Sequence, residues 1–147
     1  MTAQRHLRLG LALTALFLAM GLWLEAMLGL RAQGLVDDEL RREFLRLGHA
    51  HGALLGLVNV ALAHALERLH TPAAWATRIR PAALVGALAV GLGFVGGGLW
   101  HGPTDPGPLV LAVPAGAMLL LSSLGAAVLL RPGDRAPGEA EDGAPEP

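Results

Sequence analysis

Four long apolar runs decide what this chain can fold into. They cover residues 9–30, 47–66, 82–101 and 109–130. A helix needs roughly 20 apolar residues to cross about 30 Å of hydrocarbon. Backbone polar groups in lipid must be satisfied within the spanning segment, so each run is expected to be a helix. We therefore predict an all-α polytopic membrane protein, a four-transmembrane-helix antiparallel bundle, as a single domain over residues 1–131.

The composition agrees with a membrane protein and excludes several other classes. Apolar residues make up 53% of the chain and charged residues 16%, whereas soluble domains contain about 25% charged residues. The net charge of −1 does not favour nucleic acid as a partner, and the absence of cysteine excludes disulfides and thiolate chemistry. Residues 132–147 are rich in Pro, Gly and acidic residues, so we expect them to form a disordered tail.

The arginines are distributed unevenly between the two sides of the predicted membrane. One side carries Arg31, Arg41, Arg42 and Arg46. The other side carries the larger set, which is Arg5, Arg8, Arg68, Arg78, Arg80, Arg131 and Arg135. Cytoplasmic loops are enriched in Lys and Arg. The chain also lacks lysine and is rich in Ala and Gly, which is typical of a GC-rich bacterial genome. We therefore predict a multi-pass protein of the bacterial inner membrane with both termini in the cytoplasm.

Ionisable residues inside the runs gather toward one predicted membrane face. Glu25 lies late in the first run, His49 and His51 open the second, and His101 closes the third. Asp105 lies in the turn that follows His101. Antiparallel helices would bring all five residues near the same boundary between water and lipid. Because an ionisable group at membrane depth is costly, this histidine cluster is the candidate functional site.

Three chemical roles are open to this cluster. Imidazole and carboxylate groups suit zinc, copper or non-haem iron, so Glu25, His49, His51, His101 and Asp105 form a candidate metal site. A haem would instead take His101 and either His49 or His51 as ligands, with the nearby glycines making room for the macrocycle. An acid beside histidines could also exchange protons, as in a transport component. His49 and His51 lie about 200° apart around a helix, so both cannot point at one centre.

Small residues at four-residue spacing mark the helix faces that we expect to meet another helix. Lipid provides no hydrophobic drive for helix association, so close packing of small residues must provide it. The three stripes are Gly21-Glu25-Gly29, Gly48-Gly52-Gly56 and Ala89-Gly93-Gly97-His101. We therefore predict that Glu25 and His101 face protein rather than lipid. The same stripes could support self-association or contacts with other membrane-protein subunits.

The segments between the runs carry signals of their own. Asp37 and Asp38 can cap a helix, which predicts a helical extension that leads into the second span. Residues 67–81 are expected to form a loop that ends at Pro81. The Gly- and Pro-rich residues 102–108 predict a tight turn.

Near the third and fourth runs, the chain resembles the YwdK-type family of small four-helix membrane proteins. The similarity rests on residues 96–100 (GGGLW), on residues 113–117 (VPAGA) and on His49 early in the second run. It implies a compact four-span bundle and supplies no activity. Our leading expectation is a small non-enzymatic membrane subunit or binding protein in the lipid bilayer. The alternatives are a metal- or haem-binding redox component and a proton-coupled transport component.

Overall fold

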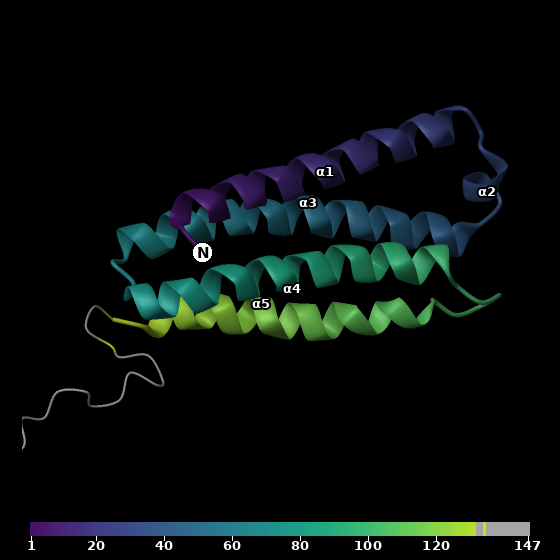
Figure 1. The fold of residues 1–147 in the computed structure, drawn as a ribbon. Coiled ribbons are helices and arrows are strands. Elements are labelled where there is room, and N and C mark those ends of the chain that lie inside the picture. Colours follow the sequence, from purple (N-terminus) through teal and green to yellow (C-terminus); the bar gives the residue numbers. More distant parts are fainter. Residues whose placement is uncertain (132–133, 135–147) are drawn as a thin grey trace, which may run out of the picture.

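The computed structural model describes residues 1–131 and Asp134, which form helices joined by short connections (Figure 1). The elements are α1 (Ala3–Gly29), α2 (Gln33–Val36), α3 (Glu39–Arg68), α4 (Ala73–Leu99), the 3-10 helix η1 (Pro108–Leu111) and α5 (Ala112–Leu129). Four helical segments are long and apolar enough to cross a membrane: α1, α3, α4, and η1 together with α5. The predicted all-α fold is therefore confirmed. The predicted disordered tail lies outside the described residues, apart from Asp134.

The four long helices lie alongside one another and alternate in direction (Figure 1). α3 packs between α1 and α4, and α4 packs between α3 and α5. α1 makes limited contact with α4 and, within the described residues, none with α5. The bundle is therefore open, with α1 and α5 as its two edges. We call the end with Met1 and the α3–α4 connection the N-terminal end, and the end with α2 and residues 100–107 the α2 end.

Small residues let the helices pack closely against one another. Phe17 of α1 is 1% exposed, and its ring fills the space beside Gly52 of α3 and Gly91 of α4. Gly56 of α3 faces Thr14 of α1 so closely that a Cβ atom at residue 56 would lie 2.7 Å from the Thr14 backbone nitrogen. The α4 stripe is likewise packed against α3 and α5. These two stripes are thus used for packing inside the chain.

The outward faces of the two edge helices are apolar and exposed. Leu22 of α1 is 75% exposed and Leu129 of α5 is 78% exposed. Soluble monomers rarely leave large contiguous apolar patches uncovered. This surface, together with the four apolar helices, indicates a membrane protein.

The start of α3 agrees with the sequence signal. Asp38 is the N-cap residue, and its Oδ1 atom accepts a hydrogen bond of 2.9 Å from the backbone nitrogen of Arg41. Such a bond satisfies one of the backbone donors that a helix start leaves without an intrahelical partner. The predicted helical extension into the second span is confirmed.

The start of α4 differs from the prediction. The prediction of a loop over residues 67–81 is largely wrong, because α3 continues to Arg68 and α4 already begins at Ala73. Pro72 is the N-cap residue, and Pro81 lies inside the helix. Pro72 precedes the first turn, where a missing N–H costs nothing, whereas Pro81 removes one hydrogen bond from the helix interior. Pro81 is exposed, so its ring can interrupt the helix surface without displacing a neighbouring helix.

Candidate functional site

The short helix α2 is held against the start of α3 by two arginines. Arg41 Nη1 donates a 3.1 Å hydrogen bond to the Gly34 carbonyl oxygen. Arg42 Nη1 donates to the carbonyl oxygens of Leu35 at 3.1 Å and Val36 at 2.8 Å. The last carbonyls of a helix lack backbone partners, and arginine side chains commonly supply them. Leu35 is 7% exposed and packs into the apolar cluster between α1 and α3. This anchor positions one wall of the candidate site.

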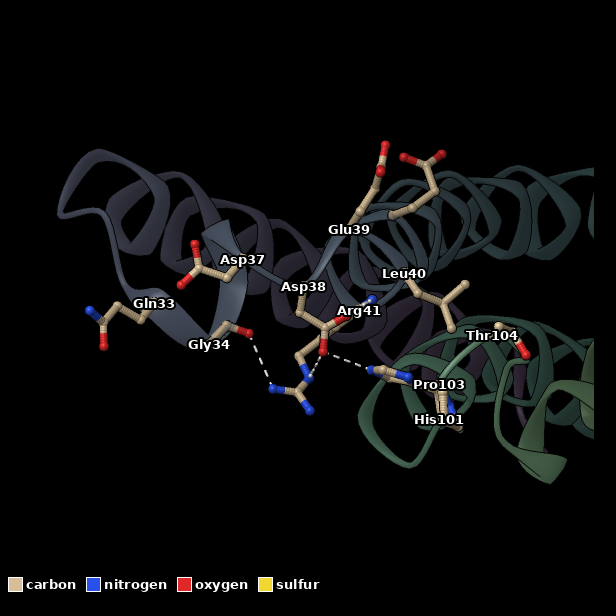
Figure 2. Close-up of a pocket in the computed structure, with 11 residues that line it drawn as sticks. Gln33, Gly34, Asp37, Asp38, Glu39, Leu40, Arg41, His101, Pro103 and Thr104 are labelled. Atoms are coloured by element: carbon tan, nitrogen blue, oxygen red, sulfur yellow. Dashed lines mark hydrogen bonds and ion pairs between the residues drawn. The ribbon is translucent and has the colours of Figure 1, made fainter.

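His101 connects the end of α4 to this anchor through Asp38, as Figure 2 shows. The His101 Nε2 atom lies 2.8 Å from Asp38 Oδ2. The Arg41 Nε atom lies 3.5 Å from the same oxygen, an ion-pair contact longer than a good hydrogen bond. Asp38 therefore performs two tasks, because one carboxylate oxygen caps α3 and the other binds His101. The contact joins residues that are 63 positions apart in the sequence.

The hydrogen bonds of this pair favour the charged forms of both groups. The His101 Nδ1 atom lies 2.6 Å from the Gly102 carbonyl oxygen. Both ring nitrogens thus face acceptors, and only the doubly protonated imidazole can donate to both. The bond to Gly102, followed by the bond to Asp38, raises the pKa of His101 above its ordinary value. The backbone N–H of Arg41, and then His101, lower the pKa of Asp38 below its ordinary value.

A polar cleft of about 880 Å³ opens around this network at the α2 end. Its walls come from α2, the first turns of α3 and the loop after α4 (Figure 2). Four carboxylates line the cleft, together with one guanidinium and one imidazole. These side chains belong to Asp37, Asp38, Glu39, Glu43, Arg41 and His101. The cleft therefore carries an excess of negative charge.

Glu25 and His49 line a different cleft of about 500 Å³ between α1 and α3. The His49 ring lies over Gly21, and its Nδ1 atom lies 2.7 Å from the Phe17 carbonyl oxygen. Glu25 is exposed in this cleft and is not packed against another helix, although residues of α3 form the opposite wall. α1 and α3 diverge toward the α2 end (Figure 1), and nothing lies within 4 Å of a Cβ atom placed at Gly29. The stripe on α1 therefore loses its partner helix after Gly21.

His51 belongs to neither cleft. Its Nδ1 atom lies 2.9 Å from the Leu47 carbonyl oxygen of its own helix. Its ring lies against Phe94 of α4, with 4.9 Å between the ring centroids. His49 therefore faces α1 and His51 faces α4. The prediction that both histidines cannot point at one centre is confirmed.

The five residues of the candidate metal site do not converge. His101 is half-buried, in agreement with the protein-facing side that the stripe on α4 predicted. Its partner is Asp38 rather than His49 or His51. Asp105 is exposed in the loop, where Thr104 Oγ1 donates to its carboxylate at 2.8 Å. Across residues 1–131 and Asp134, no three His, Asp or Glu side chains are grouped to hold a metal ion. The reason is geometric, because these residues lie on three separate helix faces and a loop.

The expected haem pocket is not formed by these residues either. Haem ligation by His101 would require a free ring nitrogen, yet both of its ring nitrogens have partners. The glycines that were expected to make room for a macrocycle instead receive the Phe17 ring. The space between α1, α3 and α4 is therefore filled by the protein itself.

A second polar cluster lies at the N-terminal end, and its histidine was not predicted. His6 of α1 and Asn59 of α3 are fully buried, and the His6 Nε2 atom lies 2.9 Å from Asn59 Oδ1. Asn59 Nδ2 donates to the carbonyl oxygens of Leu55 at 2.9 Å and of Ala83 in α4 at 3.4 Å. Three helices thus meet at one amide. A sequence signal existed, because a four-residue step back from Gly10 along the buried face of α1 reaches His6.

Arg80 completes this second cluster. Its side chain is 9% exposed, with Nη2 paired to the Glu67 carboxylate. Its Nη1 atom donates to the carbonyl oxygen of Met1 at 3.1 Å. Arg80 therefore ties α4 to the end of α3 and to the start of the chain. The N-terminal cluster therefore holds three helices together.

Comparison of this chain with known protein families, curated proteins and solved structures finds no match. The resemblance to the YwdK-type family therefore stays a prediction.

Proposed function

We propose that this chain is a small non-enzymatic binding protein of the bacterial inner membrane, and that the cleft at the α2 end takes a positively charged ligand. The observation that carries the proposal is the charge of that cleft. Four carboxylates line it against one guanidinium and one imidazole. Its volume of about 880 Å³ falls within the roughly 300–1,000 Å³ that is typical of small-molecule sites.

Two of these carboxylates line the cleft outside the contact between Asp38 and His101. Asp38 is already engaged by Arg41 and His101. The side chains of Asp37 and Glu39 point away from the contact between Asp38 and His101 (Figure 2). A primary ammonium group would donate charge-assisted hydrogen bonds to such carboxylates. Amines are therefore the ligand class that this cleft favours.

The network around Asp38 supports binding by fixing the walls of the cleft. Arg41 holds α2 through the Gly34 carbonyl, and His101 holds the loop after α4 through Asp38. Walls that are fixed before binding reduce the ordering cost that a ligand must overcome. The proposed roles are thus ligand contact for Asp37 and Glu39, and positioning for Asp38, Arg41 and His101.

Ligand class can be tested on the purified full-length protein in detergent. Thermal unfolding is recorded with ethanolamine, putrescine, acetate or phosphate added at matched ionic strength. The two amines are expected to raise the melting temperature, because a ligand that binds the folded state stabilises it. The double variant Asp37→Asn/Glu39→Gln should lose this response, whereas the control Glu25→Gln should keep it. The proposal fails if the amines act no more strongly than the anions.

We propose the orientation of the chain in the membrane from the arginine distribution, which favours the N-terminal end as the cytoplasmic side. The α2 end would then face the periplasm, so the cleft would be open to solutes outside the cytoplasm. A reporter that is active only in the periplasm, inserted at Gln33, should be active. The same reporter fused after Pro147 should be inactive. The reverse pattern would contradict this orientation.

A further inference from the structure

We propose that one phospholipid with an amine headgroup binds in the groove between α1 and α4, with its headgroup at the α2 end. The headgroup part of this proposal rests on the cation preference proposed for the cleft. The starting observation is that two apolar clefts lie on one stripe of α1. Leu9, Leu13 and Leu16 line the lower cleft, of about 280 Å³. Trp23 and Met27 line the upper cleft, of about 500 Å³. Successive positions differ by three, four or seven residues, the spacing of one helix face.

α4 supplies the opposite side of the lower cleft, and its C-terminal end lines the upper cleft together with residues of α2 and α3. Leu84 and Leu88 line the lower cleft, and Leu99 and Trp100 line the upper one. The groove exists because α1 and α4 both pack on α3 and make little contact with each other. The buried Phe17 ring fills the space beside Gly52 and Gly91, where the three helices meet. An apolar groove at this depth in a bilayer is open to acyl chains.

Part of the groove has the length of the hydrocarbon of one leaflet. The lining residues extend from Leu9 to Met27, about 27 Å along α1 at 1.5 Å per residue. The stripe from Leu13 in the lower cleft to Trp23 in the upper one accounts for about 15 Å of this rise. Half of a hydrocarbon core about 30 Å thick is also about 15 Å. A chain from one leaflet could therefore lie along this stripe. Trp23 and Trp100 are 49% and 66% exposed, and exposed tryptophans are typical of the headgroup level.

The polar end of the groove carries both charges of a zwitterionic headgroup. Arg41 and Gly34 line the upper apolar cleft and also the acidic cleft, so the two clefts adjoin. Arg41 uses Nε and Nη1 for its contacts with Asp38 and Gly34, and a guanidinium carries five N–H donors in all. A phosphate group can therefore accept from Arg41, while an ammonium group donates to Asp37. Phosphatidylethanolamine-type lipids combine these two groups on an acyl anchor.

Native mass spectrometry of the delipidated full-length protein tests the headgroup. The protein is titrated with phosphatidylethanolamine, phosphatidylcholine or phosphatidylglycerol that carry the same acyl chains. The one-to-one adduct with phosphatidylethanolamine should form about tenfold more tightly, because only its headgroup carries a cation that also has N–H donors for a carboxylate. Asp37→Asn/Glu39→Gln should remove this preference. Equal binding of the three lipids, or strongest binding of phosphatidylglycerol, would overturn the proposal.

A groove-filling variant tests where the acyl chain lies. Ala12 lines the lower cleft and is exposed, so Ala12→Trp fills the groove without entering the packed core. It should weaken the adducts of all three lipids about tenfold, whereas Leu121→Trp on the exposed face of α5 should not. Unchanged lipid binding in Ala12→Trp would overturn the groove site. If ethanolamine still raises the melting temperature while no lipid preference is found, the lipid proposal fails and the cation-binding cleft stands.

Discussion

The two ends of this molecule use the same kinds of polar residue for different purposes. At the N-terminal end, His6 and Asn59 are fully buried between three helices. At the α2 end, the side chains of His101 and Asp38 are 13% and 24% exposed and line a cleft. Helix spacing, rather than residue type, therefore decides whether a histidine is packed between helices or lines a solvent-accessible site.

Backbone approach explains the difference in helix spacing. Near the N-terminal end, Gly10 of α1 lies against the Gly56 carbonyl oxygen, with 3.2 Å between that oxygen and a Cβ atom placed at residue 10. Near the α2 end, Gly29 of α1 has no such neighbour. The helices therefore close over His6 and diverge around Glu25. Substitutions that alter this contrast should change stability most at the N-terminal end, where the helices are close, and least at the α2 end, where they diverge.

The largest effect is expected from Gly56→Ile. An isoleucine at residue 56 cannot fit beside Thr14, because the Cβ atom alone would lie 2.7 Å from the Thr14 backbone nitrogen and 3.0 Å from its Cα. α1 must move away from α3, and overpacking of this kind costs typically about 1–3 kcal/mol. Thermal or denaturant unfolding in detergent measures the loss. Gly125→Ile in α5 is the matched control, because nothing lies within 4 Å of a Cβ atom there. Equal losses for the two variants would refute the idea that the α1–α3 contact closes this end.

A smaller effect is expected at the buried pair of His6 and Asn59. Replacing either residue by leucine removes the hydrogen bond between α1 and α3. Double-mutant cycles on interhelical hydrogen bonds in membranes give about 0.6 kcal/mol on average and at most about 1.7 kcal/mol. The cycle of His6→Leu, Asn59→Leu and the double variant should give a coupling in that range. A coupling near zero would mean that the 2.9 Å contact does not hold α1 to α3.

The pair of Asp38 and His101 should make stability depend on pH at the open end. His101 has a raised pKa, so its contribution is complete below the ordinary value of 6.5 and is lost as the pH rises through the folded value. Asp38 has a lowered pKa, so its contribution is complete above 3.8 and is lost as the pH falls through its folded value. The pair therefore contributes fully between these two ordinary values.

Melting temperatures of the parent and of His101→Gln test this window. The advantage of the parent should be largest at about pH 5–6 and should shrink toward about pH 9, as the imidazolium loses its proton. Added salt should also reduce the advantage, because the pair is partly exposed and is screened. A difference between the two proteins that stays constant from pH 5 to pH 9 would be evidence against a charged pair.

Hydropathy and local signals predicted most of the fold. Span length is a property of consecutive residues, so the four helices could be located from the apolar runs alone. The cap at Asp38 is also local, since its partner is the backbone of Arg41, three residues later. The stripe on α3 correctly marked the face that meets α1, because the same glycines face Thr14 and Phe17. These features depend on neighbours along the chain or on one helix.

The candidate site could be predicted only in part, because it depends on how helix ends meet. The phase of the α4 stripe placed His101 on a protein-facing side, but nothing in its spacing identified Asp38 as its partner. The phase of α1 placed Glu25 beside Gly21 and Gly29, yet the divergence of α1 from α3 exposes it. Sequence periodicity describes a face of one helix. The distance from that face to the next helix is a tertiary property.

The smallest effect is expected from Glu25→Gln, and it tests this view of the open end most directly. If Glu25 were a buried ligand or a paired charge, its neutralisation would cost several kcal/mol. The positive partner would then be left as an uncompensated charge in a low-dielectric site. Glu25 is instead exposed beside Arg46 and His49 in a solvent-accessible cleft. Surface substitutions usually change the free energy of unfolding by less than about 0.5 kcal/mol. His49→Leu, which removes the contact with the Phe17 carbonyl, should therefore cost more than Glu25→Gln under the same unfolding conditions. A larger loss for Glu25→Gln would place an unrecognised partner next to this carboxylate and restore it as a functional centre of the α2 end.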